Sequence, residues 1–86
     1  MNTITMINVE KSCQAIKEIS VAKGFTIKRL QKALGLESVQ TIYHWFSGRS
    51  IPSIDNLFTL AHVLNVQVEQ LIVTEEIEVE EERDWL

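Results

Sequence analysis

The sequence predicts a small all-α protein with one folded domain. Glycine and proline are scarce (three and one in 86 residues), apolar residues make up 45%, and apolar side chains recur at helical spacing in five segments. Four of these segments follow an Asn, Thr or Ser, the residue types that cap helix N-termini. We therefore expect a compact five-helix domain over residues 9–73, with a short N-terminal arm (1–8) and an acidic C-terminal tail (74–86).

The first predicted helix spans residues 9–22. Asn8 is suited to cap its N-terminus, and Gly24 can end it by adopting a left-handed conformation. One face of this helix is apolar, so we expect it to be buried. That face contains Val9, Cys13, Ile16, Ile19 and Ala22.

Two short helices are predicted next, over residues 27–34 and 39–46. Thr26 and Ser38 are their expected N-caps, and Gly35 and Gly48 follow their C-termini. Their expected core residues are Leu30, Ala33, Leu34, Val39, Ile42 and Phe46. Trp45 is expected to be half-buried against the next helix.

A fourth helix is predicted over 54–64, capped by Ser53 and ended by Asn65. Its many apolar side chains predict that it forms the centre of the core. These are Ile54, Leu57, Phe58, Leu60, Ala61 and Leu64, with His62 among them in a structural role. Val68, Leu71 and Ile72 indicate a short fifth helix.

The two ends of the chain carry weaker signals. Residues 1–8 alternate Thr and Ile, which favours a frayed arm and leaves a short edge strand as the alternative. Residues 74–86 hold seven acidic residues and one Arg, which favours a solvated tail. Ile77 and Val79 nevertheless alternate with charges, and Trp85 and Leu86 are costly to expose, so pairing or docking of this segment is the alternative.

Composition excludes several classes of function. The single cysteine, Cys13, is expected to be a small buried apolar residue. Neither His44 nor His62 has a cysteine or carboxylate partner at the spacing of metal ligands. We therefore expect no catalytic residues, no metal and no cofactor. No apolar run approaches about 18 residues and no secretory leader is evident, so we expect a cytoplasmic protein without a membrane partner.

Charge is divided unevenly along the chain. The net charge is −4, but residues 1–50 hold seven basic and three acidic residues, whereas 51–86 hold one basic and nine acidic. The basic half contains the two short helices joined by a tight turn. Helices joined so abruptly cross steeply and leave the second helix exposed on the surface. An exposed second helix of this kind is what enters the major groove of DNA in helix-turn-helix proteins.

This arrangement predicts two groups of DNA contacts. The outward stripe of the third helix carries side chains with hydrogen-bonding chemistry for base edges. The predicted base-reading residues are Gln40, Thr41, His44 and Ser47. Basic and hydroxyl side chains around them predict phosphate contacts, which supply most of the affinity. The predicted phosphate-contacting residues are Lys28, Arg29, Lys32, Tyr43, Arg49 and Ser50.

The ordered series of core, turn and cap residues over 16–72 resembles the lambda-repressor/Cro-like, or xenobiotic-response-element-type, helix-turn-helix regulators. The matching residues are Ile16, Ile19, Gly24, Phe25, Thr26, Leu30, Leu34, Gly35, Ile42, Trp45, Gly48, Pro52, Ser53, Leu57, Leu60, Ala61, Leu64, Val66 and Leu71. The resemblance implies a lambda-repressor-like fold and a transcriptional regulator, such as a repressor, that binds operator DNA as a homodimer. The sequence departs from the family pattern at Ile27, Gln31 and Phe46, and its turn before the third helix is one residue longer.

A second function remains open on the same fold. The acidic tail suggests a protein-interaction module or an antitoxin-like protein, in which the tail binds a protein partner or covers the chain's own basic residues. For the DNA-binding function we expect a homodimer on a palindromic operator, with the interface at the fifth helix and the segment after it, where Val66, Val68, Ile72 and Val73 otherwise lack cover.

Overall fold

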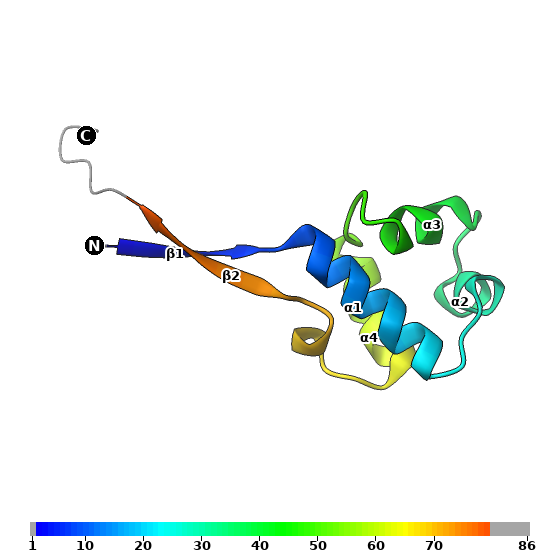
Figure 1. Cartoon of the computed structure of the whole chain (residues 1–86). Helices are drawn as coiled ribbons and strands as arrows, with labels where there is room; N and C mark the ends of the chain where they lie inside the picture. The colour runs from blue at the N-terminus through cyan, green and yellow to red at the C-terminus, as the bar shows by residue number, and fades with distance from the viewer. Residues whose placement is uncertain (1, 80–86) are drawn as a thin grey trace.

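The computed structural model describes residues 2–79, which form four α-helices, one short 3₁₀ helix and two strands (Figure 1). In chain order these are β1 (Asn2–Ile7), α1 (Val9–Ala22), α2 (Ile27–Leu34), α3 (Gln40–Phe46), α4 (Ile54–Leu64), η1 (Val68–Gln70) and β2 (Thr74–Val79). The expected all-α, five-helix fold is therefore wrong in two respects. The fifth helix is only a single 3₁₀ turn, and residues from both expected flanking segments form strands.

Helix boundaries follow the predicted caps closely. Asn8, Thr26 and Ser53 each accept a hydrogen bond from a backbone N–H three residues on, as side-chain N-caps do. Ser38 is the exception, because its hydroxyl accepts from the N–H of Gln40 at 3.0 Å while Val39 occupies the cap position. Helix α3 consequently begins at Gln40, one residue later than predicted.

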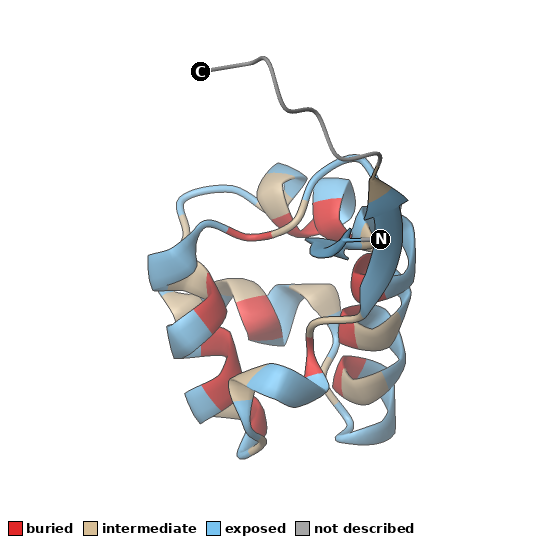
Figure 2. Ribbon diagram, turned by 90° about the vertical axis from the view of Figure 1, so that its left-hand side faces the viewer, coloured by how far each residue is buried: buried red, intermediate tan, exposed pale blue. Residues whose placement is uncertain are grey.

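The helices pack around one apolar core to which every helix contributes (Figure 2). Its buried residues are Ile16, Leu30, Ile42, Trp45, Leu57, Leu60, Ala61, Leu64 and Leu71. Trp45 is more deeply buried than expected, with 2% of its surface exposed, whereas Phe46 is only partly covered. None of the helices within residues 2–79 combines the length and apolar character needed to cross a membrane.

Several apolar residues assigned to the core from periodicity lie on the surface instead. On α4 the four buried residues span an arc of about 100° of the helix, and Ile54 and Phe58 fall just outside it. These two side chains are 73% and 62% exposed. The predictions for Val9, Ala22, Ala33 and His62 are wrong in the same way, because all four are exposed. A short helix has one neighbour-facing arc, and periodicity alone does not locate its edge.

β1 and β2 pair antiparallel and extend away from the helices as a two-stranded ribbon (Figure 1). Asn2 pairs with Val79, Ile4 with Ile77 and Ile7 with Thr74. Over residues 2–7 and 74–79, the strand and pairing alternatives are therefore confirmed, in place of a frayed arm and a solvated tail. Pairing supplies hydrogen-bond partners for the backbone groups along one edge of each segment, which neither segment can do alone. Residues 80–86, including Trp85 and Leu86, lie outside the described residues.

Hydrogen bonds at the root of the ribbon attach it to α1. The buried hydroxyl of Ser12 accepts from the N–H of Val73 at 2.8 Å and donates to its carbonyl at 3.2 Å. The N–H of Asn8 donates to the same carbonyl at 2.8 Å, and its side-chain amide donates to a carboxylate oxygen of Glu75 at 3.2 Å. These contacts close the chain into one unit by joining the segment after η1 to the start of α1.

Candidate nucleic-acid interface

The turn between α2 and α3 is held by the backbone and by one side chain. Gly35 adopts a left-handed conformation (φ 68°), and the N–H of Leu36 donates to the carbonyl of Gln31 at 3.0 Å. The amide of Gln31 then donates to the carbonyls of Leu36 and Glu37, at 3.2 and 3.3 Å. Gln31 is half-buried, because its side chain bridges the turn between the two helices. A residue that departs from the family pattern thus fixes the turn that places α3.

Helix α3 is anchored by two side chains on one face. Ile42 is fully buried and Trp45 nearly so, and the helix contacts both α1 and α2. Gln40, His44 and Ser47, on the opposite stripe, are exposed, as predicted. Thr41 is only partly exposed, and Tyr43 is half-exposed on the flank. Rigid anchoring on one face with polar side chains on the other is the geometry that a recognition helix requires.

The residues of the exposed stripe of α3 differ in which hydrogen-bonding groups remain free to contact DNA. The Ser47 hydroxyl donates to the carbonyl of His44 at 3.2 Å, so towards a ligand it offers its oxygen as an acceptor. Within residues 2–79, the side chains of Gln40 and His44 make no hydrogen bond. Both can therefore donate and accept at a base edge without first breaking a contact.

The predicted phosphate-contacting residues are all exposed, but the side chain of Arg29 already makes contacts within the protein. Its guanidinium donates to the carbonyl of Gly24 at 2.9 Å and stacks over the ring of Phe25, 5.0 Å from the ring centre. Arg49 lies three residues after the end of α3, and its N–H donates to the carbonyl of His44 at 3.0 Å. Lys28 and Lys32 lie on the surface of α2. The sequence did not reveal the packing role of Arg29, which depends on where Phe25 lies.

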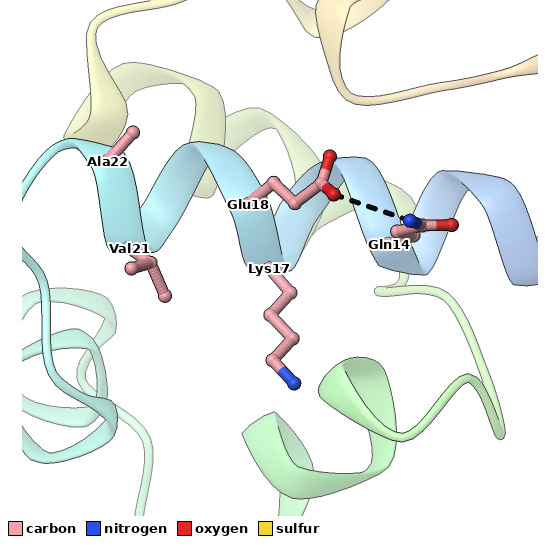
Figure 3. A pocket seen from close by; sticks show the side chains of 5 residues that line it. All are labelled: Gln14, Lys17, Glu18, Val21 and Ala22. Carbon is pink, nitrogen blue, oxygen red and sulfur yellow. Dashed lines mark hydrogen bonds between the residues drawn. The ribbon is translucent and has the colours of Figure 1, made fainter.

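Lys17 is a candidate that the sequence analysis missed. It lies on α1, and Figure 3 shows its side chain extending towards α3. It lines a hollow of about 320 Å³ together with Ile27 of α2 and Tyr43, Phe46 and Ser47 of α3. Its ammonium group therefore shares a surface with two predicted DNA contacts. The sequence places Lys17 on the exposed face of a helix, but only the packing shows that α3 is the neighbour.

The hollow shown in Figure 3 is not an enclosed ligand site. It has a volume of about 440 Å³, and its five lining residues all come from α1. Gln14 donates to the Glu18 carboxylate across it, at 3.3 Å. A shallow groove along one helix lacks the convergent walls that small-molecule sites have.

Cys13 is buried, as predicted, and its thiol donates to the carbonyl of Ser50 at 3.3 Å. Burial raises the pKa of this thiol, so the reactive thiolate is disfavoured. No three His, Cys, Asp or Glu side chains within residues 2–79 are grouped closely enough to hold a metal ion. Cys13 therefore has the environment of a core residue.

Comparison with known proteins agrees with this geometry. A model of the helix-turn-helix family matches residues 16–71, and the chain therefore belongs to that family. Membership defines it as a DNA-binding transcriptional regulator and points away from an enzyme.

Among solved structures, the fold is similar to that of the restriction-modification controller protein C.AhdI from Aeromonas hydrophila. The two chains are 25% identical, with a TM-score of 0.66, and the match covers 73% of this chain and 94% of the other. A comparison with curated proteins gave no significant match.

Proposed function

We propose that the protein binds a specific operator in double-stranded DNA, with α3 in the major groove. The observation that carries this proposal is the division of α3 into a buried face, held by Ile42 and Trp45, and an exposed polar stripe. Gln40 and His44 are the main base-reading residues, because their side chains are exposed and make no hydrogen bond within the described residues. Thr41 and Ser47 contribute less, since one is partly covered and the other uses its proton within the helix.

Phosphate contacts are assigned to residues around this stripe. Tyr43 is exposed on α3, and Arg49 and Ser50 are exposed in the segment after it. Lys28 and Lys32 are exposed on α2, where Arg29 also contributes, stacked over the ring of Phe25. Three to five neutralised phosphates per subunit correspond to a log–log salt slope of about −3 to −4.5. Because such binding is weak at physiological salt, we propose that a homodimer binds a palindromic operator as a repressor or activator, with half-sites about one helical turn apart. A controller protein among its structural neighbours supports a regulatory role.

Selection from a random pool of double-stranded DNA at physiological salt tests the proposal. We expect enrichment of one two-fold symmetric site. His44→Ala should relax the base preference at one position of each half-site, whereas His62→Ala, at an exposed histidine of α4, should leave the enriched sequence unchanged. Retention without enrichment would contradict specific binding, and no retention would contradict DNA binding altogether.

A protein-binding role for the acidic segment is the alternative. Glu75, Glu76 and Glu78 are exposed on β2, which extends away from α2 as far as Val79 (Figure 1). Deleting the segment would remove β2 itself, so the better test replaces these three glutamates by glutamine. Tighter DNA binding would support a segment that blocks the DNA-binding surface, and unchanged binding would contradict blocking by these three glutamates.

A further inference from the structure

The β1–β2 ribbon is chemically different on its two faces. Paired residues point to the same side of an antiparallel sheet, and successive residues alternate. One face therefore carries Ile4 beside Ile77, Met6 beside Glu75, and Asn2 beside Val79. The opposite face carries threonines and glutamates, with Ile7 at the root. Ile4, Met6 and Ile77 are 45%, 46% and 39% exposed, so within residues 2–79 the apolar face is uncovered.

The two outer edges of the ribbon also differ. β2 carries three glutamates, and charged residues are a common protection of an exposed sheet edge against another strand. β1 has the sequence Asn-Thr-Ile-Thr-Met-Ile, with four β-branched residues, no charge and no proline. Among the described residues β1 pairs only with β2. Its second edge is therefore a strand-pairing surface that carries none of the usual protection.

Two strands extending from the body are marginal by themselves, since stable sheets in water need three or more strands with an apolar face. We propose that β1 pairs antiparallel with β1 of a second copy of this chain, forming a four-stranded sheet in the order β2–β1–β1–β2. The apolar side chains of both copies then lie side by side on one face and contact each other laterally. That this dimer is the operator-binding form rests on the proposed function; the pairing itself does not.

Symmetry and charge together select this pairing over the others. An antiparallel pair of identical strands is related by a two-fold axis and closes at two copies. Pairing of β2 with β2 would bring three glutamates of each copy together. Pairing of β1 with β2 of the next copy would leave both ends open and generate fibres. Only the β1–β1 arrangement leaves acidic strands at both outer edges, where they prevent further addition.

The helical bodies do not obstruct this sheet. Each ribbon leaves its body at the start of α1, and a six-residue strand spans about 20 Å. Antiparallel pairing therefore places the two bodies at opposite ends of the shared sheet. The exposed stripe of α3 stays uncovered in each, because the ribbon extends away from α3 (Figure 1).

A matched pair of substitutions tests the proposal by sedimentation equilibrium of the full chain. Thr5→Lys places a charge in the middle of β1, opposite Glu76, which favours the ribbon itself and opposes pairing between copies. Thr74→Lys makes the same chemical change on the outer strand β2. We expect the wild type and Thr74→Lys to be dimers, and Thr5→Lys to weaken dimerisation about fivefold, since like charges on neighbouring strands of one sheet are destabilising.

Amide hydrogen exchange gives a second readout that does not depend on a variant. In a ribbon alone, alternate amides of β1 face solvent and exchange fast, whereas in the four-stranded sheet every central amide of β1 is bonded. We expect continuous protection in the wild-type dimer and alternating protection in the monomer that dilution of the wild type produces. Continuous protection in a monomer would overturn the proposal in favour of residues 80–86 covering β1.

Two other results would overturn it. One is a wild-type monomer at high micromolar concentration. The other is a Thr5→Lys protein that dimerises as tightly as the wild type, and dissociation of that dimer by Phe58→Lys would then place the interface on the exposed face of α4. DNA binding separates this inference from the proposed function. A monomer that selects a specific site would contradict only the inference, and a dimer of the expected kind that retains no DNA would contradict only the function.

Discussion

Replacing Ser12 with alanine tests how the ribbon is attached to the helices. The Ser12 hydroxyl is fully buried and makes two hydrogen bonds to Val73, of 2.8 and 3.2 Å. The Val73 carbonyl keeps a partner in the variant, because the N–H of Asn8 also donates to it. The Val73 N–H loses its partner. One lost hydrogen bond and one unsatisfied donor cost about 2 kcal/mol in the free energy of unfolding.

That loss is large for a domain of this size. One kcal/mol lowers the melting temperature of a 60–100-residue domain by about 4–8 °C, so Ser12→Ala should melt about 8–16 °C lower. Urea denaturation followed by helical circular dichroism measures the free energy directly. We also expect Ser12→Ala to accelerate amide exchange more in β2 than in α4, because the broken contact lies at the root of the ribbon.

Ser20→Ala is the matched control. Ser20 lies on the same helix and is equally buried, but its hydroxyl has no hydrogen-bond partner within the described residues. Removing an unsatisfied buried hydroxyl should leave stability unchanged or raise it by up to about 1 kcal/mol. Equal destabilisation in both variants, or an unchanged Ser12→Ala, would refute the reasoning from hydrogen bonds.

Three further predictions concern the DNA-binding surface and the core. Arg49→Ala should weaken binding to all duplexes alike and reduce the magnitude of the salt slope by about 1, whereas Gln40→Ala should change base preference at one position; similar behaviour of the two would contradict the assigned roles. Gln31→Ala removes two hydrogen bonds from the turn before α3 and should lower stability by about 1–2 kcal/mol, as measured by urea denaturation, together with operator affinity; unchanged affinity would show that the turn does not position α3. Burial raises the pKa of the Cys13 thiol above its ordinary value of 9.0, so the unfolded chain ionises first as the pH rises. The free energy of unfolding of the wild type minus that of Cys13→Ala should therefore be constant at lower pH and fall above about pH 9, and a flat difference would contradict the effect of burial.

The local elements were largely predictable from the sequence. The bounds of α1, α2 and α4 agree with the predicted segments to the residue, because caps and left-handed termini are chosen by side chains within a few positions of each other. The exposed stripe Gln40, His44 and Ser47 followed from the same periodicity. The error at the start of α3 came from Ser38, which caps from one position further out.

The interface expected at the fifth helix illustrates the opposite case. Val66, Val68 and Ile72 were expected to lack cover, but they pack against the core. Among the described residues, the exposed large apolar side chains lie on β1, α1, α3, α4 and β2 instead. A sequence pattern shows that an apolar residue needs cover and does not show which neighbour supplies it.

By itself, the sequence determined the helices of the DNA-binding unit and the family to which they belong, because the signals for both lie within a few turns of the chain. Tertiary structure alone decided that residues 2–7 and 74–79 form one ribbon, that Ser12 attaches it, and that Lys17 lies beside α3. Each of these contacts joins residues that are far apart in the sequence. The stabilising energy of such a contact exists only when both segments are brought together, so neither segment carries a local signal strong enough to predict the contact.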